Sequence, residues 1–345
     1  MPVPRRESHS AEMMDRIRDE PYACSLSGFF FADCILTGLY SGFSGAGSFG
    51  GRHIFCRQEV QVMKVIRLSN HVEVPQLGFG VFQITDEEEC KRSVLTALRT
   101  GYRLIDTAAC YGNERAVGEA VKESGIARED VFLTSKVWIQ DAGYERTMLS
   151  FEKTLENLQT DYLDLYLIHM PYGDYYGSWR AMEELYKKGK VRAIGVCNFE
   201  ADRLVDLILN SQVVPAVDQV ELHPFCQQKK LREIMYHYDV TPMAWAPFAE
   251  GRDGIFTNET LSAIGQQYRK KPSQVILRWL RQSNIIAIPK SVHRERIEEN
   301  FDIDSFRLED EDLVRISQMD RGVSQILDIR SLLEVYRLFH IRFEQ

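Results

Sequence analysis

The sequence predicts an α/β protein in which residues 63–345 fold as one (β/α)8 TIM barrel with an N-terminal β-hairpin. Three observations lead to this prediction. From Met63 onward, short apolar runs alternate with amphipathic helical patterns, which is typical of βα units around a parallel sheet. Eight strands fit into roughly 280 residues, the usual size of this barrel. Polar residues stand at the carboxyl ends of six different strands, where barrels assemble their active sites, whereas a doubly wound sheet uses one switch point. They are Asp106, Lys136, His169, Asn198, Gln219 and Lys290.

The first half of the barrel contains the hairpin and four of the strands. Asp86 is followed by three glutamates, and acidic residues are favoured at a helix N-terminus, so a helix is expected there. Gly101 ends that helix, and a second helix is expected from Asn113 to Ser124. The hairpin is expected at Val65–Leu68 and Val72–Val74, and the strands at Leu77–Phe79, Leu104–Asp106, Val131–Lys136 and Leu163–His169.

The second half supplies the other four strands. They are expected at Ala193–Cys197, Ala216–Glu221, Thr241–Trp245 and Ile285–Pro289. Helical patterns separate each pair of strands, and two of them, at about Glu259–Arg269 and Ser273–Gln282, lie between the last two strands. The alternation therefore continues to the end of the barrel.

The composition excludes several classes of protein. With 44% hydrophobic and 27% charged residues, the chain has an ordinary globular composition, and its formal charge of −8 argues against a nucleic-acid partner. No apolar run approaches the roughly 18 residues that span a membrane. The seven cysteines contain no CxxC pair, and the histidines do not have metal-ligand spacing. We therefore expect a cytoplasmic monomer with reduced thiols and no metal.

Residues 1–62 differ in character from the rest of the chain. An apolar stretch from Ser25 to Tyr40 follows a charged start, but Asp33 interrupts it, which argues against a signal peptide. Gly45 to Gly50 match the GxGxxG dinucleotide fingerprint, yet the flanking residues predict neither the preceding strand nor the following helix that the motif needs. We interpret residues 1–62 as an extension that is disordered or results from an upstream start, with translation beginning at Met63.

Three of these polar side chains, together with a nearby tyrosine, suit the reduction of a carbonyl group. Reduction needs hydride on carbon and a proton on oxygen, and a tyrosine can deliver the proton, although its ordinary pKa is about 10. A neighbouring ammonium lowers that pKa, and the ammonium needs a carboxylate because a buried unpaired charge costs several kcal/mol. Tyr111, Lys136 and Asp106 suit these three roles, and His169 can orient the substrate oxygen. Taken singly, each could be a solvated, hydrogen-bonded or packing residue.

Dispersed motifs make the sequence resemble the aldo-keto reductase superfamily. Leu104–Glu114 (LIDTAACYGNE) is similar to the segment that bears the catalytic aspartate and tyrosine of that family. Thr134–Trp138 (TSKVW) resembles its lysine strand, Tyr166–Pro171 (YLIHMP) its histidine strand, and Ile288–Asn300 (IPKSVHRERIEEN) its adenosine 2′-phosphate site. The resemblance extends over about Val65–Asp320, and the order of the motifs is the family's order.

The resemblance implies a reductase that transfers hydride from NADPH to aldehydes or ketones. Its catalytic tetrad would be Asp106, Tyr111, Lys136 and His169, with Tyr111 as the general acid. Tryptophan at position 245, where many relatives have tyrosine, is similar to the bacterial branch that contains 2,5-diketo-D-gluconate reductases. A non-catalytic NADPH-binding or structural barrel is the alternative, since fold alone does not establish function.

The resemblance also implies how NADPH is bound. Asn198 and Gln219 would bind the nicotinamide carboxamide, and Trp245 would stack on the ring; packing in the core is the alternative for Trp245. Basic groups near a helix start suit a phosphate, so a preference for NADPH over NADH follows, unless Arg296 is merely solvated. Lys290, Ser291 and Arg296 would bind the phosphate. The full expected set is Cys197, Asn198, Gln219, Trp245, Lys290, Ser291, Val292, Arg296, Glu299 and Asn300.

Two departures from the family pattern concern the cofactor. Cys197 stands where serine is common, and a thiol is a weaker hydrogen-bond donor than a hydroxyl. Phe248, Ala249 and Glu250 replace a more usual Leu-Gly pattern beside the expected pyrophosphate. Glu250 would repel a phosphate there unless it turns away or pairs with Arg252.

The pocket above the nicotinamide is expected to be mostly apolar. By resemblance, Phe82, Trp138, His169, Met170 and residues of the C-terminal tail would contact the substrate. Such a pocket suits small aldehydes and ketones, including 2-oxoaldehydes and sugar-derived carbonyls. The sequence does not distinguish reduction from alcohol oxidation as the physiological direction, nor does it select one substrate.

Overall fold

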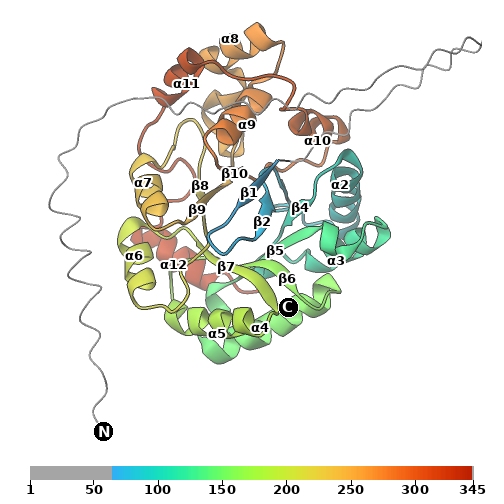
Figure 1. The fold of residues 1–345 in the computed structure, drawn as a ribbon, viewed down its shortest axis with the longest axis vertical. Coiled ribbons are helices and arrows are strands. Elements are labelled where there is room, and N and C mark those ends of the chain that lie inside the picture. The colour runs from blue at the N-terminus through green and yellow to red at the C-terminus, as the bar shows by residue number, and fades with distance from the viewer. Residues whose placement is uncertain (1–63, 344–345) are drawn as a thin grey trace, which may run out of the picture. The chain divides into compact units, whose positions relative to one another are not determined.

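A closed sheet of eight parallel strands is the centre of the computed structural model, which describes residues 64–343 (Figure 1). The strands are hydrogen-bonded in chain order. They are β3 (Phe79–Gly80), β4 (Leu104–Asp106), β5 (Phe132–Val137), β6 (Leu163–Ile168), β7 (Val191–Cys197), β8 (Val217–Glu221), β9 (Thr241–Trp245) and β10 (Ile286–Ala287). Gly78 N donates to Ala287 O at 2.9 Å, and Ala287 N donates to Gln76 O at 3.0 Å, so the first and last strands close the barrel.

Helices form a ring outside the sheet (Figure 1). They are α2 (Glu87–Thr100), α3 (Glu114–Glu123), α4 (Tyr144–Leu158), α5 (Tyr175–Lys187), α6 (Ala201–Leu209), α7 (Lys229–His237), α8 (Glu259–Tyr268), α9 (Pro272–Gln282), α10 (Arg294–Phe301) and α11 (Asp310–Ser317). A further helix, α12 (Leu332–His340), packs instead in a separate apolar cluster with Trp138 and Met170. Short 3-10 helices follow three of the strands: η1 (Ala109–Tyr111), η3 (Ile139–Asp141) and η4 (Ala249–Thr257). Another, η2 (Arg128–Asp130), lies between α3 and β5. The apolar faces of the ring pack against the outside of the sheet and form the larger core.

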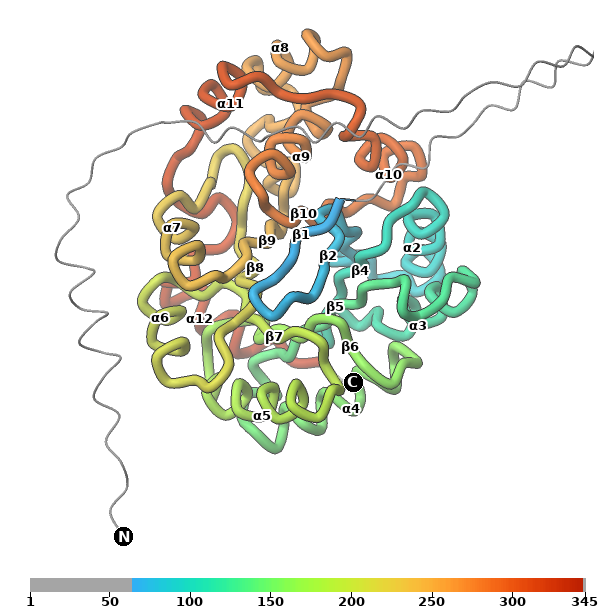
Figure 2. Tube along the Cα trace, viewed as in Figure 1, coloured from blue at the N-terminus to red at the C-terminus, as the bar shows by residue number. Residues whose placement is uncertain are grey.

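A hairpin covers one end of the barrel. Its strands β1 (Val65–Arg67) and β2 (Glu73–Pro75) pair antiparallel, and Figure 2 shows the hairpin lying across the sheet. Ile66, Leu68 and Val74 of the hairpin join the apolar cluster that fills the barrel interior. The opposite end, where the parallel strands terminate, is therefore the end open to a ligand.

Local sequence signals explain where the helices begin and end. Asp86 accepts a hydrogen bond from Glu89 N at 2.7 Å, which caps α2, and Gly101 follows that helix with a φ of 125°. Gly118 lies where α3 crosses α4, and a Cβ there would be 2.6 Å from the Leu158 carbonyl. Glycine at this position therefore allows the two helices to approach closely.

The (β/α)8 prediction is confirmed, including the hairpin and the two helices α8 and α9 before the last strand. The first strand is shifted: Leu77 forms only an isolated bridge with Ala287, and β3 begins two residues later. Helix α12 was not predicted. The interpretation of residues 1–62, with the GxGxxG match at 45–50, falls outside the described residues and stays a prediction.

Within residues 64–343, no helix is long and apolar enough to cross a membrane. The same residues contain no group of three or more histidine, cysteine or acidic side chains that could hold a metal ion. The four cysteines of this part of the chain, Cys90, Cys110, Cys197 and Cys226, are free thiols.

Candidate active site

The four predicted catalytic side chains meet at the carboxyl end of the barrel. Asp106 is the last residue of β4, Lys136 lies near the end of β5, and His169 follows β6 directly. Tyr111 ends η1, the short helix that follows β4. Because parallel neighbouring strands end at the same edge, residues up to 63 positions apart in sequence are brought together.

Lys136 is the centre of this group and has no exposed surface. Its Nζ donates to Asp106 Oδ1 at 2.6 Å and to the carbonyl oxygen of Thr107 at 2.8 Å. The Tyr111 hydroxyl is 3.4 Å from the same Nζ. The second carboxylate oxygen of Asp106 accepts a hydrogen bond from Gln219 Nε2 at 2.9 Å. The charged pair is thus fully bonded inside the protein, as a buried pair must be.

The electrostatics of the tyrosine are set by two opposing effects. Burial raises the pKa of Tyr111, and Lys136 lowers it, as the sequence analysis expected of an ammonium. Burial is the larger effect, so the net pKa of Tyr111 lies above its ordinary value. Burial lowers the pKa of Lys136, but attraction to Asp106 and to Tyr111 raises it above the ordinary value. The protein therefore holds a neutral phenol beside a charged ammonium.

His169 lies between two aromatic rings at the same rim. Its ring meets Tyr111 edge-on with centroids 5.5 Å apart, and Trp138 edge-on at 4.9 Å. Burial, with a smaller contribution from Lys136, lowers the pKa of His169 well below its usual value. Its Nδ1 is 3.4 Å from Cys110 Sγ. The imidazole is therefore neutral and carries one proton.

The residues expected at the nicotinamide carboxamide are bonded to one another and to the catalytic group. Asn198 Nδ2 donates to the His169 carbonyl at 3.1 Å, and Asn198 Oδ1 accepts from Trp245 Nε1 at 2.9 Å. Gln219 contacts Asp106 and also Met243 Sδ, at 3.0 Å. Cys197 is buried in the cluster that fills the barrel. Asn198 thus connects the half-buried Trp245 to the backbone of His169, while Gln219 is bonded to the buried pair.

The segment that follows β10 has the features of an anion site. Lys290 and Arg296 are exposed, and neither makes an ion pair or hydrogen bond within residues 64–343. Ser291 is buried, and its Oγ accepts from His293 N at 3.1 Å just before α10 begins. Two free basic groups beside a helix start suit the phosphate of NADPH. Of the remaining expected residues, Val292 is half-buried, Glu299 pairs with Lys271 at 2.5 Å, and Asn300 is buried.

Aromatic and aliphatic side chains surround the catalytic group on its outer side. Phe82 is 50% exposed, and its ring lies 4.9 Å from that of Tyr111. Trp138 and Met170 belong to an apolar cluster with Leu338 of α12. Trp138 Nε1 donates to the Ile341 carbonyl at 3.2 Å. The C-terminal tail therefore packs against the side chains that lie next to His169.

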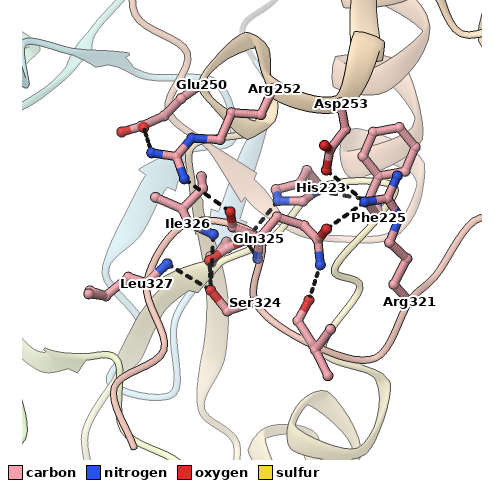
Figure 3. A network of polar contacts seen from close by, with 12 residues as sticks. His223, Phe225, Glu250, Arg252, Asp253, Arg321, Ser324, Gln325, Ile326 and Leu327 are labelled. Atoms are coloured by element: carbon pink, nitrogen blue, oxygen red, sulfur yellow. Dashed lines mark hydrogen bonds and ion pairs between the residues drawn. The ribbon is translucent and has the colours of Figure 1, made fainter. Parts of the chain in front are cut away.

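A second part of the tail connects to the loop after β9 (Figure 3). Arg321 pairs with Asp253 at 2.6 Å, and Arg252 donates to the Gln325 carbonyl at 3.1 Å. Glu250 pairs with Arg252 at 3.2 Å, which is one of the two arrangements expected to prevent it from repelling a phosphate. Gln325 N in turn donates to Glu221 at the end of β8 at 2.7 Å, a buried carboxylate that also contacts His223 at 2.9 Å.

Sequence reasoning missed two parts of the site. Cys110 was read only as one of seven cysteines, although it directly precedes Tyr111. Helix α12 was not predicted, although Val335 and Leu338, three residues apart, share the face that packs against the cluster of Trp138 and Met170. That helical spacing was the available signal.

Comparisons with known proteins agree with this geometry. The aldo/keto reductase family matches residues 76–321. The chain is 48% identical to a glyoxal reductase of Bacillus subtilis, with 74% of this chain and 92% of the relative covered. It is 40% identical to the methylglyoxal reductase DkgA of Escherichia coli, with 75% and 94% covered. A crystal structure of a Bombyx mori aldo-keto reductase in complex with NADP superimposes with a TM-score of 0.73 at 31% identity, covering 77% and 95%.

Proposed function

Since the chain belongs to the aldo/keto reductase family and is an NADP-dependent oxidoreductase that reduces aldehydes or ketones, we propose that Tyr111 is its general acid and that small 2-oxoaldehydes are among its substrates. The observation that carries the assignment of Tyr111 is the buried ammonium of Lys136, which reaches both Asp106 and the tyrosine hydroxyl. The alternative of a non-catalytic barrel is not supported, because the relatives are reductases and all four polar side chains are present and together.

The proposed roles follow from the contacts. NADPH, when bound, supplies the hydride that reduces the carbonyl carbon. Tyr111 gives its hydroxyl proton to the carbonyl oxygen, and the phenolate that remains is stabilised by the charge of Lys136 until solvent returns the proton. Asp106 keeps Lys136 charged and fixed. His169 donates a hydrogen bond to the substrate oxygen and so orients it.

The residues that would hold the cofactor fit it chemically. Lys290 and Arg296 are unpartnered cations at an exposed segment, and Trp245 presents a half-buried ring whose edge is fixed by Asn198. We propose that the first two bind the 2′-phosphate and that Trp245 stacks on the nicotinamide. Gln219 already donates to Asp106, so it would connect the carboxamide to the catalytic pair.

The substrate proposal rests on the relatives and on the pocket wall. Two relatives are named for glyoxal and methylglyoxal, which are small and carry adjacent carbonyl groups. The pocket wall combines aromatic rings with the tail, which leaves a mostly apolar rim around a few polar atoms. Phe82, Trp138, His169 and Met170 are the proposed substrate contacts.

The decisive experiment measures NADPH oxidation by the full chain with glyoxal, methylglyoxal and a panel of larger aldehydes and ketones. We expect the 2-oxoaldehydes to be reduced with the highest kcat/KM. Tyr111→Phe should lower kcat by roughly 100- to 10,000-fold, the usual contribution of general acid catalysis, without changing NADPH binding.

The matched control is Tyr102→Phe. This change also removes a tyrosine hydroxyl, one that donates to the Ile297 carbonyl of α10 and contacts none of Asp106, Lys136 and His169, and it should leave kcat unchanged. Equal losses in both variants, or full activity in Tyr111→Phe, would exclude Tyr111 as the acid. A preference for large ketones over 2-oxoaldehydes would refute the substrate proposal.

We also propose that the protein works in the cytoplasm as a monomer, without metal, nucleic acid or membrane. Its requirement for reduced nicotinamide and its four free described thiols support a reducing compartment. Light scattering after gel filtration tests the monomer, and a dimer mass would contradict it.

A further inference from the structure

An interaction that the proposed mechanism does not use joins Cys110 to His169. Cys110 lies in η1, immediately before Tyr111, and its Sγ is 3.4 Å from His169 Nδ1, a normal distance for a hydrogen bond to sulfur. The thiol packs against the apolar cluster that contains Trp138 and Met170. The thiol is therefore held beside the histidine by η1, which also carries Tyr111, and by the cluster of Trp138 and Met170.

The direction of this hydrogen bond follows from the protonation states of the two groups. Burial raises the pKa of the Cys110 thiol to about 12, so it is S–H at neutral pH. His169 is neutral because burial lowers its pKa. One of the two must donate, and an imidazole nitrogen is a better acceptor than sulfur, which accepts weakly. The thiol therefore donates to Nδ1, and the single proton of the ring is on Nε2.

That tautomer has a consequence at the opposite edge of the ring. Nε2 lies away from Cys110 and carries the hydrogen atom that His169 needs in order to donate to a substrate oxygen. In the other tautomer, Nε2 would present a lone pair to that oxygen, which repels it. The second ring nitrogen of a histidine commonly fixes the tautomer through its hydrogen bond.

We propose that Cys110 is a positioning residue, which holds His169 as the Nε2–H tautomer by donating its thiol hydrogen to Nδ1. This proposal rests on the proposed function of His169 as the residue that orients the substrate. Cys110 itself touches neither substrate nor cofactor in this mechanism. As a protonated thiol it is also a weak nucleophile, which suits a site for electrophilic 2-oxoaldehydes.

The test compares Cys110→Ala, which removes the donor, with Cys110→Ser, which keeps one. Cys90→Ala is the matched control, since it deletes another buried thiol, in α2, outside the site. In Cys110→Ala we expect kcat to fall roughly fivefold, the effect of one hydrogen bond, with KM for the carbonyl and NADPH affinity changed less. Cys110→Ser should recover part of kcat, and Cys90→Ala should match the unmodified protein.

The tautomer is measured directly in the full chain labelled with ¹⁵N-histidine. Long-range ¹H–¹⁵N spectra distinguish Nε2–H from Nδ1–H, and His169→Gln assigns the signals. We expect the Nε2–H pattern in the unmodified protein and in Cys110→Ser, and a mixture in Cys110→Ala. An Nδ1–H pattern in the unmodified protein, or an unchanged pattern in Cys110→Ala whatever its kcat, overturns the proposal. The spectra require no turnover, so they judge this proposal even if the proposed reduction were not observed.

Discussion

Two stretches of the same barrel rim differ in whether their charged side chains are paired within the protein. At the ends of β4 and β5, Lys136 and Asp106 are buried and every hydrogen-bonding partner comes from the protein. After β10, Lys290 and Arg296 are exposed and have no partner among the described residues. The charges proposed for catalysis are thus already paired within the protein, whereas the charges proposed for cofactor binding have no partner in the described residues and can pair with the ligand.

The physical reason lies in the dielectric surroundings. An unpaired charge inside the barrel would cost several kcal/mol, so Lys136 can stay charged only if Asp106 lies beside it. An exposed guanidinium is solvated by water and needs no protein partner, so Arg296 can stay free without loss of stability. Substitutions should therefore affect folding and activity together in the first stretch, and only binding in the second.

The largest effect is expected from Lys136→Met. We expect kcat to fall by roughly 100- to 10,000-fold, because the phenolate of Tyr111 loses its neighbouring charge. The free energy of unfolding should fall by about 3–5 kcal/mol, because Asp106 is left buried without its cation. Stopped-flow NADPH oxidation and urea denaturation measure the two effects.

The double variant Lys136→Met with Asp106→Asn separates the effect on kcat from the effect on the free energy of unfolding. It removes the stranded charge, so part of the lost stability should return while the activity stays low. If the double variant were as unstable as the single one, the difference between the two stretches would not be electrostatic.

A smaller effect is expected from Arg296→Ala. Loss of a charge-assisted hydrogen bond should raise the Kd for NADPH roughly 10- to 100-fold, with no change in Kd for NADH or in unfolding free energy. Quenching of tryptophan fluorescence during titration measures both affinities. Arg294→Ala is the control, since Arg294 is on the same helix but pairs with Glu298 at 2.7 Å. An equal increase in the Kd for NADPH and the Kd for NADH would contradict a site for the 2′-phosphate.

The smallest effect is expected from pH. The raised pKa of Tyr111 keeps the acid form present as pH increases, and the lowered pKa of His169 keeps its ring neutral as pH falls through 6.5. Neither group therefore titrates near neutrality, and kcat for reduction should change less than about twofold between pH 6 and 8.5. A steady-state pH profile at saturating NADPH checks this. A break near pH 6.5 would show that His169 is more exposed to solvent than its contacts imply.

Most of the fold could be predicted because it depends on local patterns. Acidic residues after Asp86, glycine at Gly101 and alternating apolar runs were enough to place the helices and strands, several within one or two residues. The start of β3 was missed because Leu77 and Phe79 are both buried, and only the pairing between strands decides which of them belongs to a regular strand. Phe79 pairs with Ile105 of β4, whereas Leu77 forms only an isolated bridge with Ala287 of β10. Helix α12 was missed because its apolar residues lie on both faces, Leu332 and Leu333 being exposed.

The sequence by itself determined the barrel order, the family and the choice of Asp106, Tyr111, Lys136 and His169 as candidate catalytic residues, because these depend on motifs whose spacing along the chain is fixed. Only the tertiary structure decided that burial outweighs Lys136 in raising the pKa of Tyr111, that Gln219 bonds to Asp106, and that Cys110 contacts Nδ1 of His169. Such contacts join residues up to 113 positions apart in the sequence. The burial of a side chain likewise depends on all its neighbours, so neither these contacts nor burial can be derived from any one segment of the sequence.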